Sequence, residues 1–408
     1  MVAELVPMVA LVALLATAYA HPPEWVEAVV AITAAGAVLA TGTLTAADLG
    51  TERRHLLPVV GFLVAILVVA ECCRAAGLFA AIGERLARAG SPQAMFALVF
   101  AVAAVITVVL SLDATVVLLT PVVLAATAAH GWSDRPFQLV CVRLANVASL
   151  LLPISNLTNL LALPDLDLSF GRFALLMAPV WVLALAVEYA GHRVRFRRQL
   201  AAPPAPTTAP ARPLPRFPLV VVGLMLAGFA VGSEIDPFWV AGAAALVLAV
   251  RGLSLGELGP GRVWSATHAP FALFVLALGL VVAALGEGPL GDLLDEVLPH
   301  EDGLLALLGI AAVGLVLSNV VNNLPATLLL VPLVAPLGPV PVLASLIGIN
   351  LGSSMTWSGS LANLLWRRTV ARSGGRVSSR DFHLLGLALT PLSVAGGVVV
   401  LHLWSAMV

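Results

Sequence analysis

The chain has 408 residues, of which 60% are hydrophobic and 11% are charged, and its formal net charge is -1. An average soluble domain is about 45–50% apolar and about 25% charged, so this composition excludes an ordinary soluble fold and indicates a membrane protein. The small net charge gives no reason to expect a nucleic-acid partner.

Motifs for cofactors and catalysis are absent from the sequence. It contains no Walker A loop and no nucleotide or haem motif, so ATP hydrolysis by this chain is excluded and no cofactor is expected. The eight His residues form no ligand pattern, and Cys72, Cys73 and Cys141 have no metal-site spacing with them. The Cys72-Cys73 pair could attract a thiophilic ion, but two small apolar residues near the end of a span are the simpler interpretation.

Apolar segments long enough to cross a membrane follow one another along the chain. A bilayer core needs about 20 mostly apolar residues per helix. The first half contains segments 4–20, 25–44, 57–80, 94–112, 113–130, 139–163 and 170–190, and the second half contains 217–233, 237–252, 268–287, 303–320, 325–338, 341–366 and 383–405. In each half, three spans are followed by a pair around a polar break, by an interrupted helix and by a last span.

A basic linker separates these halves. Residues 191–216 carry six Arg and six Pro without an acidic residue, which predicts an extended loop on the cytoplasmic side. The linker divides the chain into two repeats, 1–190 and 217–408.

The interrupted helices, 146–161 and 350–366, are alike in sequence. The aligned pairs are Asn146 with Asn350, Ser149 with Ser353, and Asn159 with Asn363. Acidic residues follow the first stretch, whereas Arg367 and Arg368 follow the second, so the two helices should end on opposite sides of the membrane. Inverted repeats of this kind are typical of secondary transporters. We therefore expect an all-α polytopic membrane protein of about ten transmembrane helices plus two re-entrant hairpins.

Asp113 is the main candidate for ion coupling. It lies in the polar break between two apolar segments, far in sequence from any other charge. A charged residue at the bilayer centre costs a few kcal/mol or more, so such residues usually serve ion or proton pathways. The alternative is a structural cap at the start of a helix, and one carboxylate can perform both roles.

Four polar clusters, two in each half, supply candidate substrate-binding groups. Irregular backbone at membrane depth is tolerated only inside protein or around a water-filled cavity, so the clusters should converge on one central site. The candidates are Thr115, Asn146, Ser149, Ser155, Asn156, Thr158, Asn159, Ser318, Asn319, Asn322, Asn323, Asn350, Ser353, Thr356, Ser358, Ser360 and Asn363. The alternative is that these side chains only form hydrogen bonds between helices.

Other charged residues in apolar segments are weaker candidates. Glu71 and Arg74 have the spacing of a structural pair on one helix face. We expect Arg143 to extend its side chain to the inner membrane surface and Glu188 to lie at that surface, near the linker.

The four polar blocks resemble a known family, the ArsB-type arsenite efflux permeases. The blocks at 113–121, 148–159, 318–327 and 350–366 are similar to family blocks in the same order, with the last the most specific. The resemblance implies a permease of the ion transporter superfamily in the bacterial inner membrane. It also implies export of arsenite and antimonite against inward proton flow, an elevator-like motion, and association with a soluble ArsA-type ATPase. It leaves open a monomer or a homodimer.

Departures from the family pattern affect the substrate more than the fold. The family has Asn where this chain has Leu112, and Asp where it has Asn146. Ser353 and Ser354 replace a Pro-Lys or Pro-Asn pair, and Trp357-Ser358 replaces Pro-Ile.

Three functional hypotheses follow. The first is a proton-coupled exporter of a neutral metalloid hydroxide, because basic residues are nearly absent from the expected cavity. The second is a sodium- or proton-coupled symporter of a carboxylate or other anion, with Ser155-Asn156 and 358–360 as its cation and substrate sites. The third is a structural or assembly membrane protein whose polar breaks only join helices.

Overall fold

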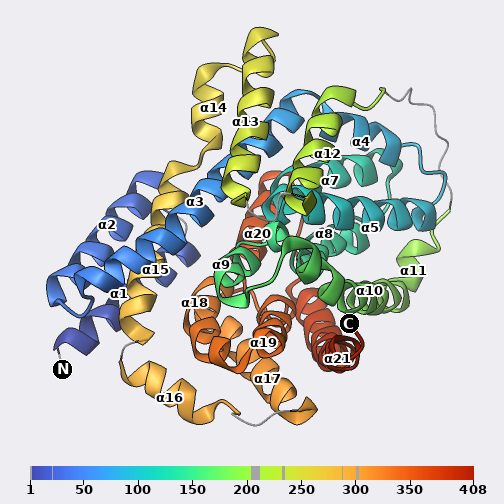
Figure 1. Cartoon of the computed structure of the whole chain (residues 1–408). Coiled ribbons are helices and arrows are strands. Elements are labelled where there is room, and N and C mark those ends of the chain that lie inside the picture. Colours follow the sequence, from blue (N-terminus) through green and yellow to red (C-terminus); the bar gives the residue numbers. More distant parts are fainter. Residues whose placement is uncertain (1, 21, 204–211, 232–234, 287, 300–302) are drawn as a thin grey trace.

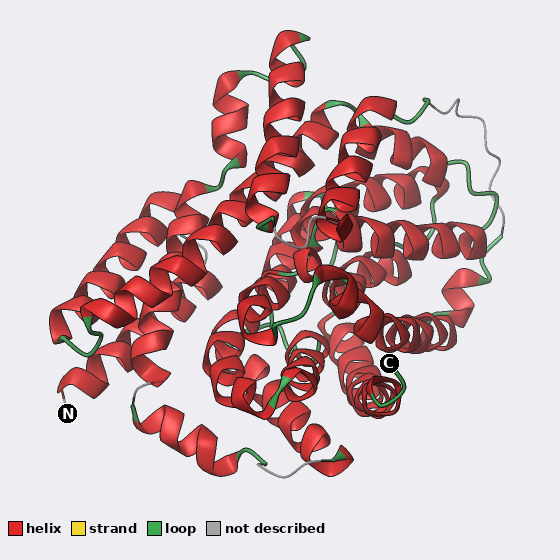
Figure 2. Ribbon diagram, in the orientation of Figure 1, coloured by secondary structure: helices red, strands yellow, loops and turns green. Residues whose placement is uncertain are grey.

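The described part of the computed structural model consists of helices joined by loops and turns (Figures 1 and 2). It describes all residues except 1, 21, 204–211, 232–234, 287 and 300–302. No strand occurs among the described residues. The prediction of an all-α polytopic membrane protein is confirmed.

Most helices correspond to predicted spans, but the helix at Ala46–Ala75 begins and ends earlier than the predicted span 57–80. The α-helices of the first half are α1 (Val2–Ala20), α2 (Glu24–Thr41), α3 (Ala46–Ala75), α4 (Leu78–Leu86), α5 (Pro92–Val109), α6 (Leu112–Ala114), α7 (Thr120–His130), α8 (Arg135–Val147), α9 (Leu157–Leu166), α10 (Phe170–Arg195) and α11 (Arg197–Leu200). Those of the second half are α12 (Arg216–Val231), α13 (Pro237–Ser254), α14 (Pro260–Ala266), α15 (Ala269–Gly286), α16 (Pro289–Val297), α17 (Leu304–Val321), α18 (Asn323–Val334), α19 (Pro339–Gly352), α20 (Leu361–Arg372) and α21 (Ser379–Ser405).

Length and composition mark many of these helices as membrane segments. Within the described residues, 8 helices are long and apolar enough to cross a membrane, and shorter apolar helices such as α18 and α19 accompany them. Helix α18 belongs to a broken pair and α19 to an interrupted helix, where a span is divided by polar residues.

The helices form two groups in space. Helices α1, α2, α3 and α15 lie together at one side of the molecule, with α13 and α14 beside α3 (Figure 1). Helices α5 to α10 and α17 to α21 form the other group. Buried apolar residues of α1, α2 and α15 make a separate cluster that also includes parts of α3 and α18. The polar breaks lie in the second group, where it meets α3 and α15.

Each broken pair turns at a polar residue with unusual backbone geometry. Ser111 precedes α6 with φ 156°, and Asn322 precedes α18 with φ 77°. Positive φ is uncommon for residues with a side chain, and in such places the surrounding structure must compensate for the strain. The compensation is visible: the side chain of each residue accepts a hydrogen bond from the backbone N–H two or three residues later.

The linker differs in part from the prediction of an extended loop. Residues up to Arg195 continue α10, and α11 follows at Arg197–Leu200. Proline begins only at Pro203, and the Arg, Gln and Leu residues before it favour helix. Residues 204–211 of the predicted linker lie outside the described residues.

Two smaller predictions concern α3. Arg74 donates to Glu71 at 2.5 Å, so the predicted pair is confirmed. Cys72 and Cys73 are buried and free, and they pack in the apolar core.

Candidate functional site

Four helices begin at one small cavity in the centre of the molecule. Ser111 precedes α6, Asn156 precedes α9 and Ser360 precedes α20, while Asn323 is the first residue of α18. All four line the same cavity. Backbone N–H groups at helix starts have no partner within the helix and carry partial positive charge, so this arrangement suits negatively charged or hydrogen-bond-accepting groups.

The cavity has a polar wall and an apolar wall. The helix starts supply the polar wall, and α3 and α15 supply the apolar one through Phe62, Leu63, Ile66 and Phe271. The space open to the centre of a water molecule is about 40 Å³. Since one water needs about 10–15 Å³ by this measure, the cavity in this conformation holds a very small ligand.

Asp113 lies in this cavity. Among the described residues, it is the only charged side chain that lines it. The structure gives its carboxylate no hydrogen bond or ion pair within the described part of the chain. The side chain is half-buried, so it is available to a ligand or a proton. The capping role considered from the sequence belongs to Ser111, whose hydroxyl accepts from the backbone N–H of Ala114 at 3.2 Å.

The side-chain amides of Asn159 and Asn363 form equivalent hydrogen bonds within the two interrupted helices, across the stretch where each helix is broken. Asn159 Nδ2 donates to the carbonyl oxygens of Ser149 and Leu152 at 2.8 and 3.1 Å. Asn363 Nδ2 donates to the carbonyl oxygens ten and seven residues earlier, at 2.8 and 2.9 Å. Each amide thus gives a partner to one carbonyl group that the interrupted helix leaves without one, that of Ser149 or Ser353. It is a second donor to the carbonyl of Leu152 or Thr356, which also accepts from a backbone N–H.

Further amides join the two halves of the chain. Asn146 Nδ2 donates to Asn363 Oδ1 at 2.9 Å, and Asn350 Nδ2 donates to Asn159 Oδ1 at 2.7 Å. These bonds are equivalent under the sequence alignment of the halves, and all four side chains are buried. We call Asn146, Asn159, Asn350 and Asn363 the amide frame.

Hydroxyl and amide groups form hydrogen bonds between each broken pair of helices and the interrupted helix next to it. Ser155 Oγ donates to the carbonyl of Val108 at 2.8 Å. In the second half, Asn322 Nδ2 donates to the carbonyl of Ser358 at 2.8 Å, and Asn319 Oδ1 accepts from Thr356 Oγ1 at 2.8 Å. The breaks and the broken pairs therefore form one connected polar core.

The predicted site residues divide into two sets. Those that line the cavity are Asp113, Ser155, Asn156, Asn323 and Ser360. Those that lie in the polar core without lining it are Thr115, Asn146, Ser149, Thr158, Asn159, Ser318, Asn319, Asn322, Asn350, Ser353, Thr356, Ser358 and Asn363. Many of the second set use their side chains in hydrogen bonds to other elements, so substrate contact for them remains a prediction.

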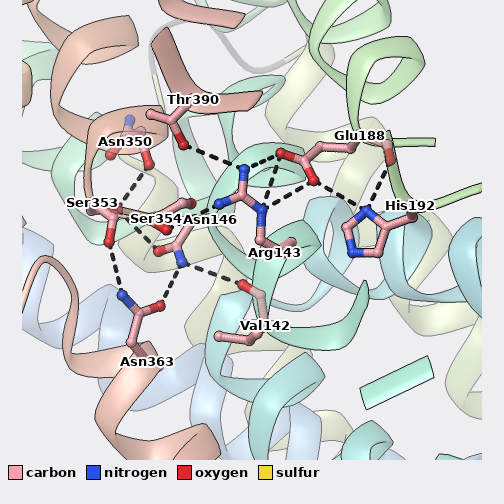
Figure 3. A network of polar contacts seen from close by, with 10 residues as sticks. All are labelled: Val142, Arg143, Asn146, Glu188, His192, Asn350, Ser353, Ser354, Asn363 and Thr390. Carbon is pink, nitrogen blue, oxygen red and sulfur yellow. Dashed lines mark hydrogen bonds and ion pairs between the residues drawn. The ribbon is translucent and has the colours of Figure 1, made fainter. Parts of the chain in front are cut away.

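The expectations for Arg143 and Glu188 were wrong. Both side chains are buried, with 1% and 0% exposed, and they form an ion pair with each other (Figure 3). The two charges were visible in the sequence as opposite signs within apolar segments, which is itself a signal of pairing inside a membrane. The apolar wall of Phe62 and Phe271 had no such signal, because such residues fill every span.

Trp357, the large departure from the family pattern, packs against rings of α20 and α21. Its ring stacks on Phe382 of α21 with the centroids 3.9 Å apart and lies 5.9 Å from the ring of Trp366. It is absent from the residues that line the cavity.

Paired broken helices whose starts converge on a central cavity define a class of protein: a membrane transporter with discontinuous helices at its binding site. The chain belongs to the citrate transporter family (CitMHS), which it matches over residues 8–347.

Individual relatives agree with this class. The chain is 26% identical over 387 residues to the arsenical pump membrane protein of Escherichia coli, covering 87% of this chain and 89% of that protein. It is 25% identical over 411 residues to an uncharacterised transporter of Mycobacterium tuberculosis, covering 93% of each. Its fold is similar to the crystal structure of the YdaH transporter of Alcanivorax borkumensis, with a TM-score of 0.57, 16% identity and 89% of this chain covered.

Proposed function

We propose that this chain exports a small neutral metalloid hydroxide, arsenite or antimonite, in exchange for protons. The observation that carries the proposal is Asp113, the only charged side chain lining the cavity among the described residues. A carboxylate accepts hydrogen bonds from hydroxyl groups, and protonation replaces one acceptor with a donor. Substrate hydroxyls and a proton would therefore compete for the same carboxylate, which is the requirement for exchange.

The other groups around the cavity fit a neutral hydroxide. Ser155, Asn156, Asn323 and Ser360 offer neutral donors and acceptors. The small volume also favours a compact ligand over a tricarboxylate. The name of the Escherichia coli relative, an arsenical pump membrane protein, agrees with this choice of substrate.

The exporter would work in the inner membrane with the two repeats, 1–190 and 217–408, inverted around the cavity and the linker on the cytoplasmic side. The group of α5 to α10 and α17 to α21 would move past α3 and α15 and carry the cavity from one side to the other. Association with a soluble ArsA-type ATPase, as a monomer or a homodimer, belongs to the same proposal.

Proton-driven arsenite uptake into everted membrane vesicles tests the proposal. Wild type should accumulate arsenite when the vesicle interior is acidic, and Asp113→Asn should lose this uptake. Asp165→Asn is the matched control, because it removes an exposed carboxylate of α9 that is not among the residues lining the cavity. Unchanged uptake in Asp113→Asn would contradict the coupling role.

A coupled carboxylate symporter is the second candidate. The four helix starts favour an anion, and the family carries the name of a citrate transporter. Citrate uptake that depends on sodium, without arsenite uptake by the same vesicles, would select this candidate. Arsenite tolerance conferred on a sensitive bacterial host would select the first.

A further inference from the structure

Arg143 and Glu188 form a buried ion pair next to the amide frame. Arg143 Nε donates to Glu188 Oε1 and Oε2 at 3.1 and 3.0 Å, and Arg143 Nη2 also donates to Oε1 (Figure 3). His192 lies on the far side of the carboxylate, where Nδ1 is 2.8 Å from the carbonyl oxygen of Glu188 and 3.4 Å from Oε2. Replacing such a pair by apolar residues often leaves stability unchanged or improves it, so stability alone does not explain its presence.

The remaining donors of Arg143 reach the end of the second interrupted helix. Nη1 donates to the carbonyl of Ser354 at 3.0 Å, and Nη2 donates to Thr390 Oγ1 of α21 at 3.3 Å. Ser354 lies just beyond α19, where the helix has stopped and carbonyl groups have no intrahelical partner. A positive charge at a helix C-terminus offsets the partial negative charge of these carbonyls.

Arg143 and Asn146 lie three residues apart on α8 and so share one face. Asn146 Oδ1 accepts from Ser353 Oγ at 3.2 Å, directly beside the Arg143 contact with Ser354. One face of α8 therefore contacts both Ser353 and Ser354 at the end of α19. Glu188 holds the guanidinium of Arg143 in the orientation that these contacts require.

The first interrupted helix has a different support. Trp181 Nε1 of α10 donates to the carbonyl of Ala148 at 3.0 Å, just beyond the end of α8. The position that aligns with Arg143 in the second half is Ile347, which is apolar and buried. A neutral indole thus supports one break, and a buried charge supports the other.

We propose that Arg143, held by Glu188, is a positioning residue that keeps the end of α19 in the conformation that forms the site. Its contacts join α8, α10, α19 and α21 into one body behind the cavity. The inference depends on the transporter class and not on the identity of the substrate.

Thiol accessibility at the break tests this role without any transport measurement. In a background with Cys72, Cys73 and Cys141 replaced by Ala, Ser353→Cys places a thiol at the end of α19, where the Ser side chain is fully buried. Ser345→Cys places one at a fully buried position earlier on the same helix and serves as the control. N-ethylmaleimide should modify both thiols slowly while the ion pair is intact.

The ion pair is then replaced by Arg143→Leu/Glu188→Leu, which leaves neither partner as an unpaired buried charge. We expect maleimide to modify the thiol of Ser353→Cys about tenfold faster or more, with the thiol of Ser345→Cys unchanged, because only the break opens. Arg143→Lys with Glu188 intact keeps the charge but lacks the planar fork that serves several acceptors at once, so it should also speed modification at Ser353→Cys.

Two results would overturn the proposal. Equal acceleration at both thiols would mean that the pair supports the whole fold, and no acceleration at either would mean that the break holds without Arg143. Arsenite uptake by the wild-type chain tests the proposed function separately, so the thiol result stands whichever substrate the protein carries.

Discussion

The two interrupted helices have the same hydrogen-bonded frame and different surroundings. Asn159 and Asn363 each close a break through two carbonyl groups of their own half, and each accepts from the other half of the chain. The first broken pair contributes Asp113 to the cavity, whereas the second contributes Leu324 at the start of α18. Arg143 contacts the end of the second interrupted helix, and the residue that aligns with it in the second half is the buried, apolar Ile347. The frame is thus symmetric, and the charges are asymmetric.

The largest expected effect comes from breaking the asymmetric ion pair. Arg143→Leu leaves Glu188 as a buried, unpaired charge, which should destabilise the protein by about 3–5 kcal/mol. The aligned change Ile347→Leu should cost less than about 1.5 kcal/mol. Thermal unfolding of the purified protein in detergent measures both. Adding Glu188→Leu to Arg143→Leu should recover most of the loss, and a failure to recover would contradict the assignment of the cost to an unpaired charge.

The symmetric frame makes a second prediction. Asn159→Ala and Asn363→Ala each leave one buried carbonyl group, that of Ser149 or Ser353, and one amide N–H from the other half without a partner. The carbonyl groups of Leu152 and Thr356 keep a backbone N–H donor in both variants. An unsatisfied buried polar group costs about 1–3 kcal/mol, so each variant should be less stable by at least about 2 kcal/mol. The two unfolding temperatures should fall by similar amounts. A large effect in one variant alone would show that the breaks are not equivalent.

Ser360 caps the start of α20 and Asn156 caps the start of α9, but only Asn156 also donates hydrogen bonds to other side chains. Ser360 Oγ accepts from the N–H of Ala362, and its loss in Ser360→Ala should cost about 1 kcal/mol. Asn156 caps α9 in the same way but also donates to Asn350 Oδ1 and Ser149 Oγ, both at 3.1 Å. Asn156→Ala should therefore cost about 1 kcal/mol more than Ser360→Ala. Equal losses would indicate that the bonds from Asn156 to the second half contribute little.

The smallest effect on transport is expected at Trp357. The ring packs on Phe382 outside the cavity, so Trp357→Leu should lower the unfolding temperature through the lost stacking but leave the apparent substrate affinity unchanged. Substrate uptake at varied concentration measures this. A clear change in affinity would place the ring in the transport path in another conformation.

The sequence was most informative about elements and least informative about partners. It placed the spans, the two broken pairs and the two interrupted helices, because an apolar segment in a bilayer must satisfy its own backbone and polar interruptions are costly there. It also selected Asp113, which does lie in the cavity. The prediction of an extended linker was wrong for residues 191–200, where the absence of proline allows helical structure. The prediction that Arg143 and Glu188 lie at the membrane surface was also wrong.

Hydropathy and the aligned Asn residues by themselves determined an all-helical transporter fold with two related polar breaks. Only the tertiary structure decided which polar groups face the cavity and which are used within the protein. Asn146 contacts Asn363, and Arg143 contacts Ser354, across more than half of the chain. Such contacts depend on how the helices pack against one another. The position of a side chain along its own helix does not determine which residue of a neighbouring helix it contacts.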